Sequence, residues 1–279
     1  MININDCTTE QKTALLKKYK YFVLTGTHNS GKSTILNKFS GAQIHYITQA
    51  SSLNFSGTMK EIQNQIIDFS LNKLNIPRND EQCKYVLNWI HDYDGIELTI
   101  LNERIRDPRF YCVGEMIREL SKAEGISFNP SNPVQYLESE KMLFNFFLSM
   151  KHANHYKPIN KYFIYDRNIF DPLYYMKYTL SHNEDFNQKT TRDQKEYLLD
   201  IYRFSMMKLY EMIYRKSLND TLFLLLDPIH EIVDDGTRNT DPECQMMVYN
   251  IARNMLEISS VDYISIGANQ GVELLNLLK

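Results

Sequence analysis

Cysteine pairs, long apolar runs and an excess of basic residues are all missing from this sequence. The four cysteines lie far apart with no CxxC pair, at Cys7, Cys83, Cys112 and Cys244. This spacing predicts neither a zinc site nor a disulfide framework, and it fits reduced thiols in a cytosol. No stretch approaches the ~18 apolar residues of a membrane span, and the N-terminus lacks the basic start and apolar segment of a signal peptide. We therefore expect a cytoplasmic protein that is not in a membrane.

Glycine and proline are also scarce, with 10 and 8 among 279 residues, whereas 43% of the residues are hydrophobic and 23% are charged. This balance is typical of a folded globular chain. The formal net charge of −3 does not favour a polyanionic partner, although a local basic groove is compatible with it. We expect one domain over residues 1–279, with nucleic acid as a disfavoured partner and a homodimer left open.

Short apolar runs alternate with longer segments of helical periodicity. The runs lie at residues 21–25, 110–114, 162–165, 221–226 and 261–266. The helical segments lie at 33–39, 136–150, 195–216 and 243–256, with a closing helix at 271–278. Such alternation predicts an α/β fold in which helices cover both faces of a parallel sheet.

The stretch from 43 to 108 does not fit this alternation, because it is too long for a connecting loop. Residues 59–74 and 81–91 have helical spacing, so we interpret the stretch as a mainly helical insertion within the domain. Its role is either packing or dimer formation, or else recognition of a substrate.

The strongest local signal is a complete GxxxxGK[ST] sequence directly after the first apolar run. It comprises Gly26, Thr27, His28, Asn29, Ser30, Gly31, Lys32, Ser33 and Thr34. The glycines permit a tight turn, so that backbone amides and the N-terminus of the following helix point at phosphate oxygens. Lys32 is expected to reach the β- and γ-phosphates, and Ser33 to supply an oxygen to Mg²⁺. The motif predicts that the chain binds ATP or GTP with magnesium, but it does not separate kinase from ATPase or switch.

The second apolar run is followed by Glu115 and Arg118, which lie one helical turn apart. Ligands of open parallel sheets bind beyond the carboxyl ends of the strands, which favours a place for both residues in the site. A carboxylate there can orient an attacking hydroxyl, and a guanidinium can hold an anionic acceptor. The alternative is a surface pair with no part in the chemistry.

The third apolar run ends in Asp166-Arg167-Asn168. Because a carboxylate beside a phosphate-binding loop commonly grips magnesium or its water shell, Asp166 is the candidate for that role. Arg167 would neutralise charge on the transferring phosphoryl group, and Asp171 is a candidate for contact with the acceptor. The competing interpretation is that Asp166 or Asn168 caps a helix.

The polar loop after the fourth run reads VDDGTRN and contains Arg238. A glycine-containing loop in this place suits a mobile cover that closes over a nucleotide and delivers a cation. Arg238 is therefore a candidate catalytic residue, although loops also carry arginines for solubility alone.

Taken together, GTHNSGKST, GEMIREL, YDRNIFDPLYY and VDDGTRN resemble the AAA_28-type P-loop domain. That group is similar to the ribosylnicotinamide kinase domain of NAD-biosynthesis proteins and to deoxynucleoside and thymidylate kinases. The resemblance implies a three-layer P-loop sandwich whose five parallel strands have the order 2-3-1-4-5, and a lid around 236–238. It also implies that Glu115 and Arg118 touch the acceptor and that Asp166 and Arg167 touch the reacting phosphates.

The hypothesis that follows is Mg²⁺-dependent phosphoryl transfer from a nucleoside triphosphate to a nucleoside, nucleotide or nicotinamide riboside-like compound. Catalysis would then consist mainly of alignment and charge neutralisation by Lys32, Arg167, Arg238 and the metal ion. One alternative is a kinase that acts on bases or ends of nucleic acid. The other is an ATPase or GTPase switch that binds a protein or lipid.

Overall fold

The computed structural model describes the following residues: 2–27, 30–39, 43–47, 58, 61, 64, 65, 68, 84–92, 95–103, 109–113, 139–141, 144, 162–182, 188–228 and 241–279. For 43–47, 84–92, 95–103, 111 and 113 the description is of the backbone.

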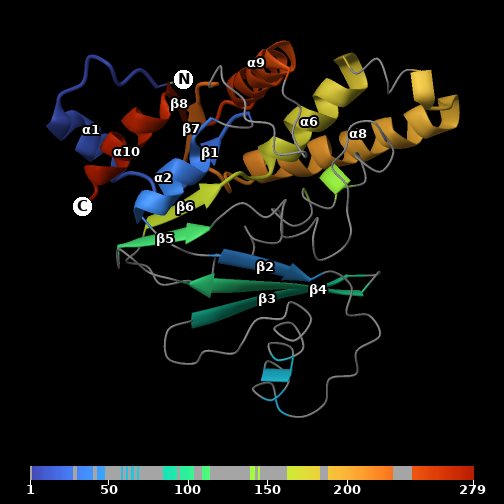
Figure 1. Cartoon of the computed structure of the whole chain (residues 1–279), viewed down its shortest axis with the longest axis horizontal. Coiled ribbons are helices and arrows are strands. Elements are labelled where there is room, and N and C mark those ends of the chain that lie inside the picture. The colour runs from blue at the N-terminus through green and yellow to red at the C-terminus, as the bar shows by residue number, and fades with distance from the viewer. Residues whose placement is uncertain are drawn as a thin grey trace.

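A parallel sheet of five strands forms the centre of the described structure (Figure 1). Its strands are β1 (Tyr21–Thr25), β5 (Phe110–Val113), β6 (Tyr162–Asp166), β7 (Thr221–Leu226) and β8 (Tyr263–Ile266). The order is β5-β6-β1-β7-β8, and all neighbours run parallel. The α/β fold with a parallel sheet is confirmed. Numbered by their order along the chain, the five strands of this sheet lie side by side in the order 2-3-1-4-5.

Alternate residues of the central strands enter two separate apolar cores. On β1, Tyr21 and Val23 belong to one cluster of buried side chains, whereas Phe22 and Leu24 belong to the other. Because side chains of a strand point alternately to opposite faces, both faces of the sheet are covered. This explains why the strand sequences are continuous apolar runs rather than alternating patterns.

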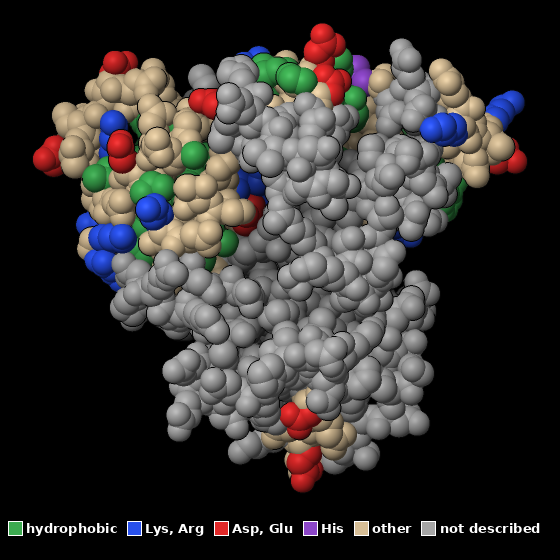
Figure 2. All heavy atoms as spheres, in the orientation of Figure 1, with side chains coloured by type: hydrophobic (Ala, Val, Ile, Leu, Met, Phe, Trp, Pro, Cys, Tyr) green, Lys and Arg blue, Asp and Glu red, His purple; other side chains and the backbone are tan. Residues whose placement is uncertain are grey.

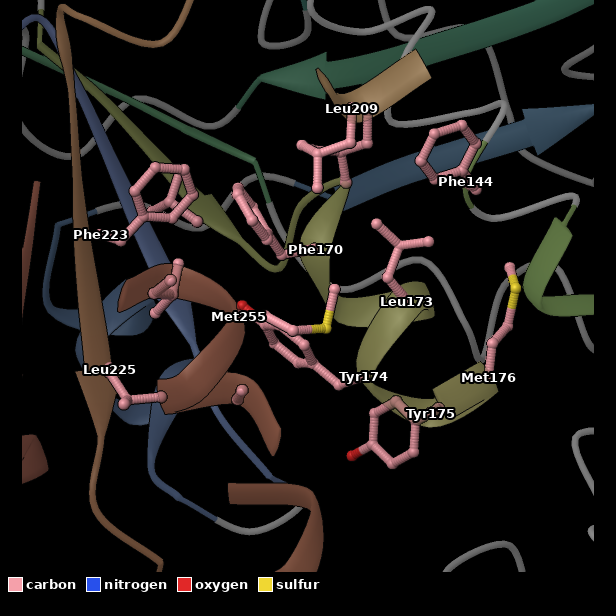
Figure 3. Packing of buried hydrophobic residues seen from close by; sticks show 14 of the residues in the cluster. Phe144, Phe170, Leu173, Tyr174, Tyr175, Met176, Leu209, Phe223, Leu225 and Met255 are labelled. Atoms are coloured by element: carbon pink, nitrogen blue, oxygen red, sulfur yellow. The ribbon is translucent and has the colours of Figure 1, made fainter. Parts of the chain in front are cut away.

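Helices lie on both faces of the sheet. They are α1 (Thr9–Leu16), α2 (Lys32–Phe39), α6 (Phe170–His182), α8 (Arg192–Tyr214), α9 (Pro242–Ile258) and α10 (Ala268–Asn276). Side chains of α6, α8 and α9 line the first core, and side chains of α1, α2 and α10 line the second. In the first core the rings of Phe170 and Phe223 meet edge to face at 5.2 Å (Figure 3). Among the described helices, none is long and apolar enough to cross a membrane.

The insertion differs from its prediction. Three strands, β2 (Gln43–Ile47), β3 (Lys84–Asp92) and β4 (Gly95–Glu103), form an antiparallel sheet in the order β2-β4-β3. The predicted helix at 81–91 is therefore wrong, and the expectation of a mainly helical insertion is corrected for the described residues. Of the other predicted helix, at 59–74, the described residues Glu61, Asn64, Gln65 and Asp68 are helical.

The physical reason for the error lies in the hairpin formed by β3 and β4. The apolar and aromatic residues of β3 occur at spacings that a helix also permits, but the pairing of Asp92 with Gly95 closes a tight antiparallel ladder. An Asp-Gly dipeptide, Asp94-Gly95, stands between the two apolar runs and is a strong hairpin signal. Strand pairing with β4 outweighed the local helical spacing.

Substitution of Phe22 by alanine should lower the free energy of unfolding by about 3–5 kcal/mol, because the side chain is fully buried between β1 and the helices beneath it. Urea denaturation measures the change. As a control, Phe204→Ala on α8, where the side chain is 50% exposed, should cost less than about 1 kcal/mol. Equal losses in the two variants would contradict the described core.

Candidate functional site

A glycine at each end shapes the loop that joins β1 to α2. Gly26 has φ of 134° and Gly31 has φ of 87°, a region that side chains disfavour. A Cβ on Gly26 would lie 2.8 Å from the carbonyl oxygen of Leu226, and one on Gly31 would lie 2.5 Å from Cβ of Ala268. The loop is therefore seated between the end of β7 and the start of α10, with no room for a side chain at either glycine.

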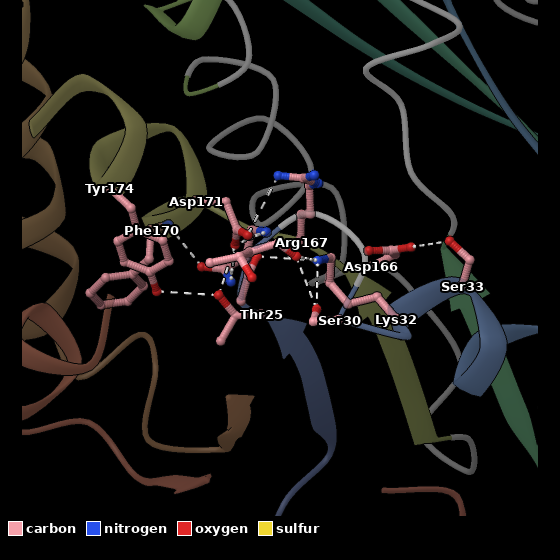
Figure 4. A network of polar contacts seen from close by, with 12 residues as sticks. Thr25, Ser30, Lys32, Ser33, Asp166, Arg167, Phe170, Asp171 and Tyr174 are labelled. Carbon is pink, nitrogen blue, oxygen red and sulfur yellow. Dashed lines mark hydrogen bonds and ion pairs between the residues drawn. The ribbon is translucent and has the colours of Figure 1, made fainter. Parts of the chain in front are cut away.

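Lys32, the first residue of α2, holds the described part of this loop together from within. Its ammonium donates to the carbonyl oxygens of Gly26 (3.1 Å) and Thr27 (2.6 Å) and to Oγ of Ser30 (3.1 Å). Ser30 in turn donates its hydroxyl proton to the carbonyl of Thr27 (3.0 Å). A buried cation thus lies at the N-terminus of a helix, where backbone amides also favour an anion (Figure 4).

Ser33 and Asp166 meet across the gap between α2 and β6. The Ser33 hydroxyl donates to Oδ2 of Asp166 at 3.3 Å. Asp166 ends β6 directly beside β1, opposite Leu24, and it is 2% exposed. Two hard oxygen donors side by side fit Mg²⁺, which takes one or two protein ligands together with phosphate oxygens and water. Among the described residues there is no group of three or more His, Cys, Asp or Glu that would form a self-sufficient metal site.

Arg167 adopts a backbone conformation that is unusual for a residue with a side chain. Its φ is 75°, and its amide donates to the carbonyl of Leu24 at 2.9 Å, so that the turn after β6 is pinned to β1. The guanidinium lies 5.8 Å from the ring centre of Tyr175, and its Nη1 lies 3.9 Å from Oδ1 of Asp171. A non-glycine residue held at positive φ costs on the order of 1 kcal/mol, and such strain often occurs at functional sites.

Asp171 is enclosed by donors from two neighbouring segments. Its Oδ2 accepts hydrogen bonds from the backbone amide of Asn168 (3.1 Å), from Nδ2 of Asn168 (3.0 Å) and from the hydroxyl of Thr25 (3.1 Å). Asn168 also accepts from the amide of Phe170 (2.8 Å) and so caps the start of α6. The capping alternative therefore applies to Asn168. The predicted contact between Asp171 and an acceptor stays a prediction, and the carboxyl is almost completely buried.

Burial raises the pKa of Asp171 from its usual 3.8 to about 6, because the charged form loses its hydration. The positive charges of Arg167 and Lys32 and the hydrogen bond from Thr25 act in the opposite direction. The pKa stays raised despite these partners, so the loss of hydration is the larger effect.

The described part of the predicted site converges at the carboxyl edge of β1 and β6. Figure 4 shows five of the predicted side chains near one another: Lys32 and Ser33 of α2, Asp166 of β6, Arg167 of the turn after it and Asp171 of α6. The other described residues of the GxxxxGK[ST] sequence lie next to them along the chain; they are Gly26, Thr27, Ser30, Gly31 and Thr34. The predicted residues His28, Asn29, Glu115, Arg118 and Arg238 lie outside the described residues, so the acceptor contacts and the lid remain predictions.

The sequence analysis gave three buried residues no role at this site. Thr25 reads as an ordinary strand residue, yet its hydroxyl links β1 to Asp171. Tyr175 belongs to the first core and also lies against Arg167; burial raises its pKa, and Arg167 acts to lower it. Glu140 is 3% exposed and close enough to Tyr175 to influence its pKa. A polar residue at the end of a strand was the available signal for Thr25, whereas no local pattern distinguished Glu140 from other helical acidic residues.

The sequence matches the AAA_28 family, described as an AAA domain, over residues 98–273. The chain belongs to the AAA_28 family. Membership indicates P-loop nucleotide binding, consistent with NTP hydrolysis or phosphoryl transfer. The matched span begins after the loop at 26–34, so in this AAA_28 protein the loop rests on its own sequence and geometry. No curated protein matches the sequence.

Substitution of Gly31 by alanine should distort the loop and weaken binding of a nucleoside triphosphate by at least about tenfold, or ~1.4 kcal/mol. The added methyl group would have to displace Ala268 and adopt φ of 87°. Titration with a fluorescent ATP analogue measures the change. Gly267→Ala is the matched control, because a Cβ there meets nothing nearer than 3.8 Å, and it should bind as the unsubstituted protein does.

Proposed function

We propose that this AAA_28 protein binds ATP or GTP with Mg²⁺ and transfers the terminal phosphoryl group to a small acceptor. The acceptor classes that we favour are a nucleoside, a nucleotide or a nicotinamide riboside-like compound. The observation that carries the proposal is the meeting of Lys32, Ser33, Asp166 and Arg167 at one edge of the sheet. A nucleotide-binding loop alone would be compatible with many reactions, whereas this group adds a second cation and two magnesium-compatible oxygens at the carboxyl edge of β1 and β6.

Each of these side chains has a role that its position supports. Lys32 lies inside the loop and would contact the β- and γ-phosphates. Ser33 and Asp166 would hold a magnesium ion or its water shell, and that ion would neutralise charge on the phosphates. Arg167 is a cation fixed next to Asp166, so it would offset the charge that develops on the equatorial oxygens during transfer.

Two other functions are alternatives with separate outcomes. A kinase acting on nucleic acid would show binding that falls steeply with salt. Figure 2 shows side chains of both signs among the described residues of this face, and the net charge of −3 does not favour a polyanion, which supports a small acceptor better. A nucleotide-dependent switch would turn over ATP at a rate that no nucleoside or monophosphate accelerates.

The test of the proposal is a ligand screen by thermal shift, followed by a transfer assay. Ligands that bind the native state raise the melting temperature, so MgATP or MgGTP should stabilise the protein and a true acceptor should add to that effect. The acceptors to be screened are nucleosides, nucleoside monophosphates and nicotinamide riboside. If neither triphosphate shifts the melting temperature, the proposal is wrong.

Substitution of Lys32 by alanine should lower the transfer rate by at least about 100-fold, or ~2.7 kcal/mol of transition-state stabilisation. The same change removes the donor that joins three loop oxygens, so nucleotide binding should weaken as well. Lys38→Ala is the matched control on the exposed side of α2 and should keep the native rate. A native rate in the Lys32 variant would contradict the assignment.

Substitution of Asp166 by asparagine should raise the concentration of Mg²⁺ needed for half-maximal nucleotide binding by about tenfold, or ~1.4 kcal/mol. The amide keeps the shape of the side chain but removes the negative charge that a hard cation prefers. Magnesium titrations at a fixed concentration of ATP measure the shift. An unchanged magnesium requirement would show that Asp166 is not part of the metal site.

A further inference from the structure

Asp171 is a buried carboxylate of the described site to which the proposed reaction assigns no chemical step. It is 1% exposed, and it lies on α6, one helical turn beyond the residues that face the phosphates. Burial of an ionisable carboxyl is costly unless hydrogen bonds and opposite charges surround it. Its retention in the core therefore needs a reason beyond packing.

The contacts of Asp171 join two segments that must keep a fixed relation if the site is to work. Thr25, which donates to Oδ2, is the last residue before the loop at Gly26. Asn168 donates twice to the same oxygen and belongs to the turn that begins with Arg167. The other oxygen, Oδ1, faces the guanidinium of Arg167 at 3.9 Å. One carboxyl group thus touches both the root of the phosphate-binding loop and the arginine beside it.

We propose that Asp171 is a positioning residue of the nucleotide site: its carboxylate ties Thr25 to the turn after β6 and holds the Arg167 guanidinium in place for the reacting phosphates. The inference rests on the proposed function and deepens it, because it names how the site is held and how acid would disturb it. Arg167 at positive φ has few ways to relax, so an anchor on its side chain decides where its charge lies.

The surroundings of Asp171 determine how the site should respond to pH. The charged groups that act on Asp171 are Arg167 and Lys32, both positive. Tyr174 and Tyr175 on α6 carry neutral hydroxyls, and burial raises the pKa of each. Glu140 acts on Tyr175 from the helical residues 139–141.

The sign of the pH effect follows from the raised pKa. Because the pKa of Asp171 in the folded protein, about 6, lies above its usual 3.8, protonation favours the folded state. The stability that protonation contributes is fully present below 3.8 and is lost as the pH rises through 6. At neutral pH the protein keeps a charged carboxylate that does not favour folding, which is expected of a group retained for the site. Below about pH 6 the neutral carboxyl should release Arg167.

The experiment compares the unsubstituted protein with Asp171→Asn in two assays, MgATP binding and ATP hydrolysis with Mg²⁺ and no added acceptor. At pH 7.5 the variant should bind MgATP within about threefold of the native affinity, because removing a buried anion does not weaken the positive field around the phosphates. Its hydrolysis rate should fall by at least about tenfold, because the transition state needs a fixed cation. The native rate should decline as the pH falls through about 6, and that step should be absent from the variant.

A readout that needs no turnover is the stability of the apo protein in a double-mutant cycle. Asp171→Asn should be less favourable for the stability of the native protein at pH 7.5 than for that of the Arg167→Gln background, because only the native protein is left with a buried cation that has lost its carboxylate. Equal effects in both backgrounds would overturn the proposal. If the native protein hydrolyses no ATP, this cycle alone decides.

Two further variants complete the test, one as a control and one as a substitute for Asp171→Asn. Asp262→Asn removes a carboxylate that accepts from the Tyr19 hydroxyl at 2.8 Å, at the amino end of β8, and it should change neither the rate nor its pH profile. Thr25→Val removes one donor to Asp171 with little change in shape, and it replaces Asp171→Asn if that variant does not fold. It should lower the rate in the same direction but by less.

The outcomes separate the two ideas. If the native protein does not bind MgATP, the proposed function fails. If it binds MgATP and Asp171→Asn keeps both the native rate and the native pH profile, only the positioning role fails.

Discussion

The parallel register between β1 and β6 is the constraint on which the site depends. It sets Asp166 opposite Leu24, and the amide of Arg167 extends the ladder by donating to the carbonyl of Leu24. A shift of one residue would turn every side chain of β6 to the other face of the sheet. Asp166 would then leave Ser33 and enter an apolar core. The backbone hydrogen bonds of the sheet therefore set where Asp166 meets Ser33 of α2.

That register is in turn enforced by the two apolar cores. Successive residues of β6, such as Phe163 and Ile164, are buried on opposite faces with no exposed surface. A slip would exchange the two sets and place side chains of different size into packing already filled by helices. Rigid packing in the cores allows a polar group at the edge to be held within a few tenths of an ångström, as the proposed phosphoryl transfer would require.

The sequence predicted those parts of the molecule in which local pattern and tertiary packing agree. The five core strands are continuous apolar runs, and the loop from Gly26 to Thr34 has the complete GxxxxGK[ST] spacing directly after the first of them. The prediction for the insertion was wrong because local pattern and strand pairing disagree there. In β3 the spacing of apolar residues suits a helix as well as a strand, and the deciding factor was pairing with β4.

Within the site, the sequence could assign chemistry to residue types but could not assign direction. Asp171 and Asp166 are both carboxylates near one strand end, yet Asp166 faces Ser33 and Asp171 faces Thr25 and Arg167. Such differences arise from where a turn ends and a helix begins, and a helix boundary cannot be predicted from sequence to within a residue. The capping bonds of Asn168 decide that boundary here.

Four ionisable side chains of the described site carry balanced charges. They are two cations, Lys32 and Arg167, and two carboxylates, Asp166 and Asp171. With both carboxylates ionised the charges of these four cancel, whereas the magnesium complex of a nucleoside triphosphate is still anionic. Under the proposed function, a site of this composition needs additional positive charge beside the triphosphate. The predicted arginine of the polar loop, Arg238, is the residue that the sequence offers for this purpose, and the raised pKa of Asp171 means that mild acid would shift the same balance towards positive charge.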